Sequence, residues 1–227
     1  MFDPVDIDLP DFLTRWHGEP VPSGQGLPPD VSSLPEPLRE WHVLASRWRK
    51  LRFGANRMIK PSLIQFDQGK AVFMRDATGD WAWAFGEENP DLVYEGEPGG
   101  EWHSVPERLA EFLVHATVIE TIALVEASLL GDQVPDEELP GILAPMQEVG
   151  FGEWRWPRTG YRIFMTDSLI ASVGPAVEPR SPWLNRSGYS SVRISGTSPS
   201  ALEYLHSATS VKWLDFGFDE EDMDEDE

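Results

Sequence analysis

Cysteine is absent from this chain of 227 residues. Its absence excludes a disulfide framework and any metal site that needs thiolates, and it is typical of proteins in a reducing compartment. The first residues, which read Met1-Phe2-Asp3-Pro4, also lack the cationic and apolar regions of a secretory signal. We therefore expect a cytoplasmic protein that folds without covalent cross-links.

A hydrophobic run long enough to cross a membrane is lacking as well. The most apolar segment, residues 112–130, is interrupted by His115, Glu120 and Glu126, and such side chains are costly at the centre of a bilayer. Its apolar residues recur at helical spacing. The segment therefore predicts a buried helix of a soluble domain, and we expect no membrane partner.

Basic residues are scarce. The chain holds 18 Lys and Arg against 39 Asp and Glu, for a formal charge of -21, so a nucleic-acid backbone would repel it and we expect no nucleic-acid partner. The acidic tail, residues 218–227, is predicted to be disordered, and without residues 219–227 the charge is still -13. This acidity has two interpretations: solubility, or steering toward a basic protein partner.

Motifs that carry chemistry are also few. The five histidines (17, 42, 103, 115 and 206) do not form a His-Glu-x-x-His pair, and the chain has neither a Gly-x-Ser-x-Gly elbow nor a phosphate-binding glycine loop. The carboxylate pairs Glu87-Glu88 and Glu137-Glu138 lie in acidic loops, where solvated charge is the ordinary state. We expect no enzymatic activity, no catalytic residues, no cofactor and no metal.

What the chain does have is an ordered series of helix and strand signals. Apolar residues at spacings of three and four predict a helix from Pro35 to about Arg52. The basic cluster at its end either complements the helix dipole or contacts phosphate. Short apolar runs then predict strands over 63–66, 71–74 and 81–85. In 81–85 the aromatic and alanine residues alternate, which suits either core packing or an exposed aromatic patch.

A second helix signal follows the hairpins. Ser104 stands three residues before Glu107, the spacing of a capping box. The helix that it opens is expected to run to Leu130, with Gly131 as its stop.

The flanking regions carry weaker signals. Residues 1–33 predict an extended arm with at most one helical turn, at 11–16, which docks Phe12, Leu13 and Trp16. After a linker over 132–145 come predicted strands at 151–156, 161–165 and 169–173, a loop over 174–188, a strand at 192–194, a helix from Ser198 and a strand at 211–216. Trp183 in that loop is either a plug for the core or an interface anchor.

Together these signals predict an α+β fold with a mainly antiparallel sheet and packed helices. We expect a single domain over residues 34–217, made of parts 34–131 and 146–217.

Several short patterns appear in a characteristic order: Leu34-Pro35 with Leu38 and Trp41, Val72-Phe73, Trp81-Ala82-Trp83, Asn89-Pro90-Asp91-Leu92-Val93 and Glu111-Phe112-Leu113. In this the chain resembles the SUKH superfamily, the Smi/Knr-type proteins, over about residues 30–130. The resemblance implies helices around a mainly antiparallel sheet. It also implies a function, because many bacterial members are immunity proteins that bind and neutralise a cognate toxin.

We therefore expect a non-catalytic protein-binding module that covers the basic active-site cleft of a toxin domain. The expected contacts are aromatic anchors within a charged rim: Trp81, Trp83 and Trp102, with Glu87, Glu88, Asp91, Glu95, Glu97 and Glu101. The alternatives are a small-molecule sensor or enzyme with scattered site residues, and a regulatory scaffold of the same fold.

Overall fold

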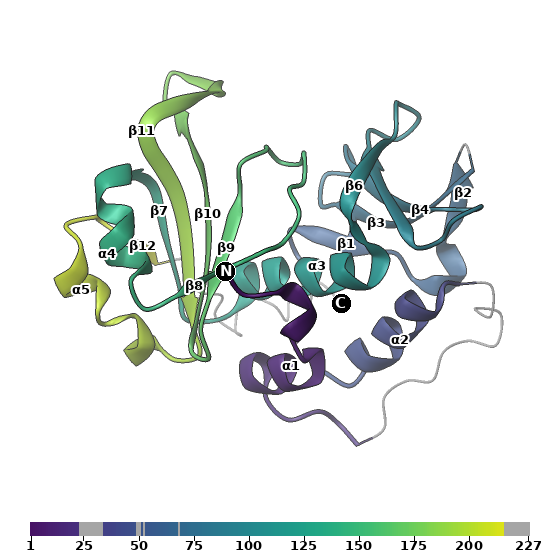
Figure 1. Cartoon of the computed structure of the whole chain (residues 1–227), viewed down its shortest axis with the longest axis horizontal. Coiled ribbons are helices and arrows are strands. Elements are labelled where there is room, and N and C mark those ends of the chain that lie inside the picture. Colours follow the sequence, from purple (N-terminus) through teal and green to yellow (C-terminus); the bar gives the residue numbers. More distant parts are fainter. Residues whose placement is uncertain (23–33, 49–50, 52, 68, 216–227) are drawn as a thin grey trace, which may run out of the picture. The chain divides into compact units, whose positions relative to one another are not determined.

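A computed structural model describes residues 1–22, 34–48, 51, 53–67 and 69–215 (Figure 1). They divide into two compact units. The amino-terminal unit comprises Pro4–Glu120 and Phe151–Trp156, and the carboxy-terminal unit comprises Met1–Asp3, Thr121–Gly150 and the residues from Pro157 onward. The α+β class with antiparallel sheets is confirmed. The single domain over 34–217 stays a prediction, and the expected disordered tail lies outside the described residues.

The amino-terminal unit is built on an antiparallel sheet of order β1-β3-β4-β5-β6, in which β2 also pairs with β3. Its strands are β1 (Asn56–Met58), β2 (Gln65–Asp67), β3 (Lys70–Asp76), β4 (Ala82–Gly86), β5 (Leu92–Gly96) and β6 (His103–Arg108). Its helical elements are η1 (Pro4–Asp6), α1 (Leu9–His17), α2 (Glu36–Ala45), η3 (Pro61–Leu63) and α3 (Leu109–Leu124). The last four residues of α3 belong to the carboxy-terminal unit.

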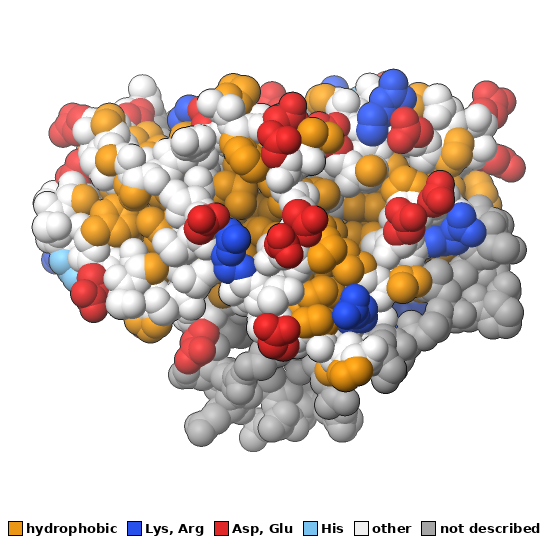
Figure 2. Space-filling model, turned by 60° about the horizontal axis from the view of Figure 1, so that its bottom comes forward, with side chains coloured by type: hydrophobic (Ala, Val, Ile, Leu, Met, Phe, Trp, Pro, Cys, Tyr) orange, Lys and Arg blue, Asp and Glu red, His pale blue; other side chains and the backbone are white. Residues whose placement is uncertain are grey.

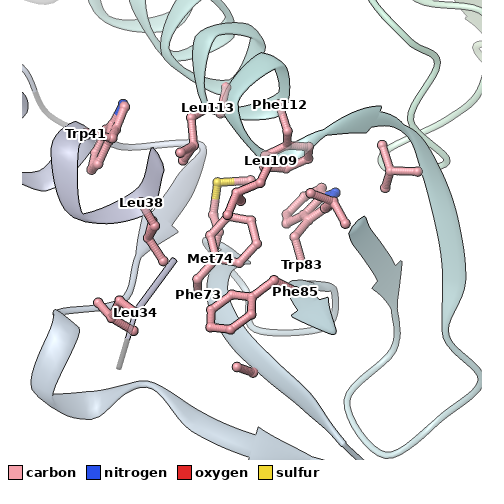
Figure 3. Packing of buried hydrophobic residues seen from close by; sticks show 14 of the residues in the cluster. Leu34, Leu38, Trp41, Phe73, Met74, Trp83, Phe85, Leu109, Phe112 and Leu113 are labelled. Atoms are coloured by element: carbon pink, nitrogen blue, oxygen red, sulfur yellow. The ribbon is translucent and has the colours of Figure 1, made fainter. Parts of the chain in front are cut away.

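One face of this sheet carries the core of the unit. The alternation in β4 places Trp83 and Phe85 in the main apolar cluster, with Trp81 packed against it, whereas Ala82 and Ala84 lie on the other face. The core-packing interpretation is thus confirmed. Figure 3 shows Trp83 and Phe85 in the same cluster as residues of α2 and α3: Leu38, Trp41, Leu109, Phe112 and Leu113.

The amino-terminal segment contains a helix rather than an extended arm alone. The Asp8 carboxylate accepts a hydrogen bond from the Asp11 amide at 2.9 Å and caps α1. The expected docking of Phe12, Leu13 and Trp16 is confirmed, because all three are buried. Residues 23–33 lie outside the described part.

The first predicted helix is shorter than expected. α2 ends at Ala45, and Arg47 lies beyond it with its guanidinium over the Trp48 ring. The other three residues of the basic cluster, Arg49, Lys50 and Arg52, lie outside the described residues.

The expected capping box is wrong. Ser104 and Arg108 pair with Tyr94 and Leu92 of β5, so the segment is strand β6, and α3 starts at Leu109. The helix also ends at Leu124 rather than Leu130. Near this end the Arg193 guanidinium donates to the carbonyl of Ala123 at 2.7 Å, as cations commonly do at helix C-termini.

The carboxy-terminal unit is a second antiparallel sheet, of order β12-β7-β11-β10-β9-β8. Its strands are β7 (Ser128–Pro135), β8 (Gln147–Val149), β9 (Arg162–Met165), β10 (Leu169–Glu178), β11 (Ser181–Gly196) and β12 (Leu214–Asp215). The helical elements η4 (Asp136–Glu138), α4 (Leu139–Leu143), η5 (Pro199–Leu202) and α5 (Leu205–Ala208) complete it. Its core includes Ile142, Val192, Ile194 and Leu205.

Three predictions for this half are wrong. The expected linker over 132–145 is the end of β7 followed by η4 and α4, residues 151–156 are not a strand, and most of the expected loop over 174–188 is the β10–β11 hairpin. Pairing between β10 and β11 overrides the proline and glycine content from which a loop is predicted.

A buried carboxylate holds the entry to β1. Glu120 of α3 is fully buried and accepts hydrogen bonds from the amides of Gly54, Ala55 and Asn56 at 2.8, 3.1 and 2.9 Å. The Asn56 side-chain amide adds a fourth at 2.7 Å. A buried carboxyl group is tolerated only when it is hydrogen-bonded in this way.

We expect Glu120→Ala to lower the free energy of unfolding by about 3 kcal/mol, because it leaves buried amide donors without acceptors. Urea denaturation measures the loss. Glu126→Ala, at an exposed residue just beyond the same helix, is the matched control and should change stability by less than about 0.5 kcal/mol. Equal stability of the two variants would contradict this role for Glu120.

Candidate protein interaction surface

The nine residues expected to contact a partner divide by exposure. Trp83 and Glu95 are 0% and 1% exposed, so neither side chain can reach a partner, and their assignment as contacts is corrected. Trp81 and Trp102 are half-buried. The remaining five are exposed: Glu87, Glu88, Asp91, Glu97 and Glu101.

Glu95 instead holds the segment Phe151–Trp156. Its carboxylate accepts from the Arg155 amide at 3.0 Å and from the Trp81 Nε1–H at 3.3 Å. Burial raises the pKa of Glu95, and these two donors oppose part of that rise.

Glu107 holds the same segment from β6. Its carboxylate accepts from the Gly152 amide at 2.9 Å and the Trp154 Nε1–H at 2.7 Å, and lies 2.7 Å from His115 Nδ1. Burial alone would raise the pKa of Glu107, but the charge and hydrogen bond of His115, with the Trp154 and Gly152 donors, outweigh it and lower the pKa. We call Glu95, Glu107 and the segment Phe151–Trp156 the carboxylate clasp.

The clasp places a pair of stacked tryptophans at one end of the sheet. The rings of Trp81 and Trp156 lie 5.6 Å apart with an interplanar angle of 16°, and both residues are half-buried. Ala82 pairs with Gly96, so Trp81 lies beside the turn between β5 and β6. A Cβ on Gly96 would overlap the carbonyl oxygen of Glu101, which shows that this turn folds back closely.

Three exposed carboxylates accompany the tryptophan pair. Asp80 precedes Trp81, and Glu97 and Glu101 lie in the β5–β6 turn. We call Trp81, Trp156, Asp80, Glu97 and Glu101 the tryptophan edge. It combines apolar ring surface with negative charge, a combination suited to binding a basic protein surface.

The other expected rim residues lie elsewhere. Glu87, Glu88 and Asp91 lie in the turn between β4 and β5, at the opposite end of β5, which five residues place about 17 Å away. Asp91 there pairs with Arg108 at 3.3 Å. The expected rim is therefore divided in two. On the face drawn in Figure 2, acidic side chains are likewise spread out rather than gathered in one cluster.

Trp102 packs against the sheet face opposite the main core, against Val72, Ala82 and Ala84. It covers small side chains there, so it is not part of the tryptophan edge.

An open groove of about 620 Å³ lies between α1, α2 and α3. Its lining is mainly apolar and includes Leu9, Trp41, Val43, Leu44 and Leu113.

Trp183 is 75% exposed, near the end of the β10–β11 hairpin. The interpretation as a core plug is therefore wrong, and the one as an interface anchor remains.

No family model matches this chain, and neither the curated proteins nor the solved structures contain a match. In the described residues no helix is long and apolar enough to cross a membrane.

The clasp predicts a specific dependence of stability on pH. Because folding lowers the pKa of Glu107, its contribution is present above the unfolded value of about 4.3 and is lost as the pH falls through the folded value. We expect Glu107→Gln to cost about 3 kcal/mol at pH 7, and the difference from wild type to shrink below about pH 4.

Denaturant unfolding of both proteins from pH 7 to pH 3 measures this difference. Glu88→Gln, at an exposed residue of the same unit, should lie within about 0.5 kcal/mol of wild type at pH 7. A Glu107→Gln penalty that stays constant down to pH 3 would contradict the lowered pKa.

Proposed function

We propose that this chain is a non-catalytic protein-binding module that acts as an immunity protein and covers a basic cleft on a toxin domain. The observation that carries the proposal is the tryptophan edge, where the stacked rings of Trp81 and Trp156 stand beside exposed carboxylates. Large rigid aromatic side chains supply most of the binding energy in many interfaces. The resemblance to the SUKH superfamily supports the same function.

The negative charge of the chain favours binding to a basic domain, whose cleft the chain can then block. A formal charge of -21 attracts a basic domain over long range and speeds association. Enzymes that act on nucleic acids commonly carry basic clefts, because their substrate is a polyanion. An acidic surface with an apolar centre can occupy such a cleft without any chemistry of its own.

The test begins with the purified chain as bait in a lysate of cells that make it, followed by identification and purification of the retained protein. We expect a basic domain whose toxicity the wild-type chain neutralises. Glu97→Ala/Glu101→Ala should weaken binding about tenfold at low salt, and the difference should shrink at high salt because counterions screen exposed charges.

Glu87→Ala/Glu88→Ala is the matched control, since it removes the same charge from the other end of β5. It should leave the affinity within about twofold of wild type. If the two double variants weaken binding equally, net charge and not the tryptophan edge drives association. A partner with an acidic surface would contradict the proposal.

A further inference from the structure

The end of the β10–β11 hairpin differs in composition from the rest of the chain. Residues 179–188 read Pro-Arg-Ser-Pro-Trp-Leu-Asn-Arg-Ser-Gly, with two arginines and no acidic residue, in a chain with 39 acidic residues. Trp183 and Leu184 are 75% and 55% exposed. Trp and Arg are enriched in protein interfaces, whereas Asp and Glu are depleted. We call residues 179–188 the hairpin tip.

The hairpin tip extends beyond the neighbouring strands of its sheet (Figure 1). On one side β9 pairs with β10 no further than Val173, and on the other β7 pairs with β11 from Tyr189 onward. Together with residues 174–178 of β10, which end in the half-buried Glu178, the tip forms a two-stranded projection that carries an exposed tryptophan.

Side-chain contacts brace this projection. Arg158 donates to the carbonyl of Pro182 and, at 3.2 Å, to Asn185 Oδ1. Gln133 donates to the carbonyl of Val177 at 2.9 Å and accepts from Arg186 at 2.6 Å. The Arg158 contacts hold Pro182 and Asn185 on either side of Trp183, and a segment that is already ordered loses less entropy on binding.

The charge of the tip indicates the chemistry of its partner. Arg180 is exposed, and the guanidinium groups of Arg158 and Arg186 add positive charge at the braces. An extended polyanion, such as RNA or an anionic membrane, would be repelled by the chain as a whole, which carries -21. A protein pocket can instead present its acidic groups to the tip alone.

We infer that the hairpin tip is a second interaction surface, separate from the tryptophan edge. It docks Trp183 and Leu184 into an apolar pocket on a protein partner, and acidic side chains at the rim of that pocket pair with Arg180. This inference does not rest on the proposed immunity function, because the two surfaces lie in different units and carry opposite charge.

The test places a photo-crosslinking residue at the tip of the full chain, as Trp183→p-benzoylphenylalanine, in cells that make the protein. The control is Phe66→p-benzoylphenylalanine, since Phe66 is 59% exposed and lies in the amino-terminal unit. We expect one protein to be crosslinked at residue 183 and not at residue 66. Mass spectrometry identifies it, and it is then purified.

Titration of the two purified proteins completes the test. Trp183→Ala should weaken binding at least tenfold and Arg180→Glu about tenfold, whereas Phe66→Ala and Glu97→Ala/Glu101→Ala should leave it unchanged; unchanged unfolding curves confirm that the variants are folded. The inference is overturned by the absence of a specific adduct, by the same adducts at both positions, or by an adduct with a second copy of this chain. Binding to anionic lipid vesicles that Trp183→Ala abolishes would also overturn it, in favour of a membrane contact.

Discussion

A carboxyl group buried away from water must accept hydrogen bonds, and three buried glutamates of the amino-terminal unit do so. Glu95, Glu107 and Glu120 are all buried, and each accepts at least one backbone amide of a segment outside its own element. Two of them hold Phe151–Trp156, which lies far along the chain from the rest of its unit. The unit therefore depends on carboxyl groups that have exchanged water for backbone amides.

The tryptophan edge depends on this clasp. The Glu95 carboxylate accepts a hydrogen bond from the amide of Arg155, the residue directly before Trp156. It accepts another from the Trp81 Nε1–H. One buried acid thus holds the indole of Trp81 and the backbone next to Trp156. Glu95, predicted at the rim of an interface, is therefore buried instead, and it hydrogen-bonds the tryptophan edge from the interior.

Short sequence patterns correctly predicted elements whose structure depends on residues close together in the chain. The Trp-Ala alternation of residues 81–85 correctly indicated a strand with an aromatic core face. Ser104 and Glu107 matched a capping box, but Glu107 is engaged by Gly152 and Trp154, more than 40 residues away, and no local pattern reveals such partners. Five of the six acidic residues predicted at a binding rim are exposed, yet the strand order places them at two ends of β5, because the distance between them depends on topology.

Hydrogen exchange of the chain alone and bound to its identified partner tests the central claim most directly. We predict that binding slows exchange in the β5–β6 turn around Glu97 and Glu101 and at the backbone around Trp81 and Trp156, while the amides of Gly152 and Arg155 are already protected in the free chain. New protection confined to other surfaces, with rapid exchange at Gly152 and Arg155 in the free chain, would contradict both the tryptophan edge as the binding surface and the clasp that positions it.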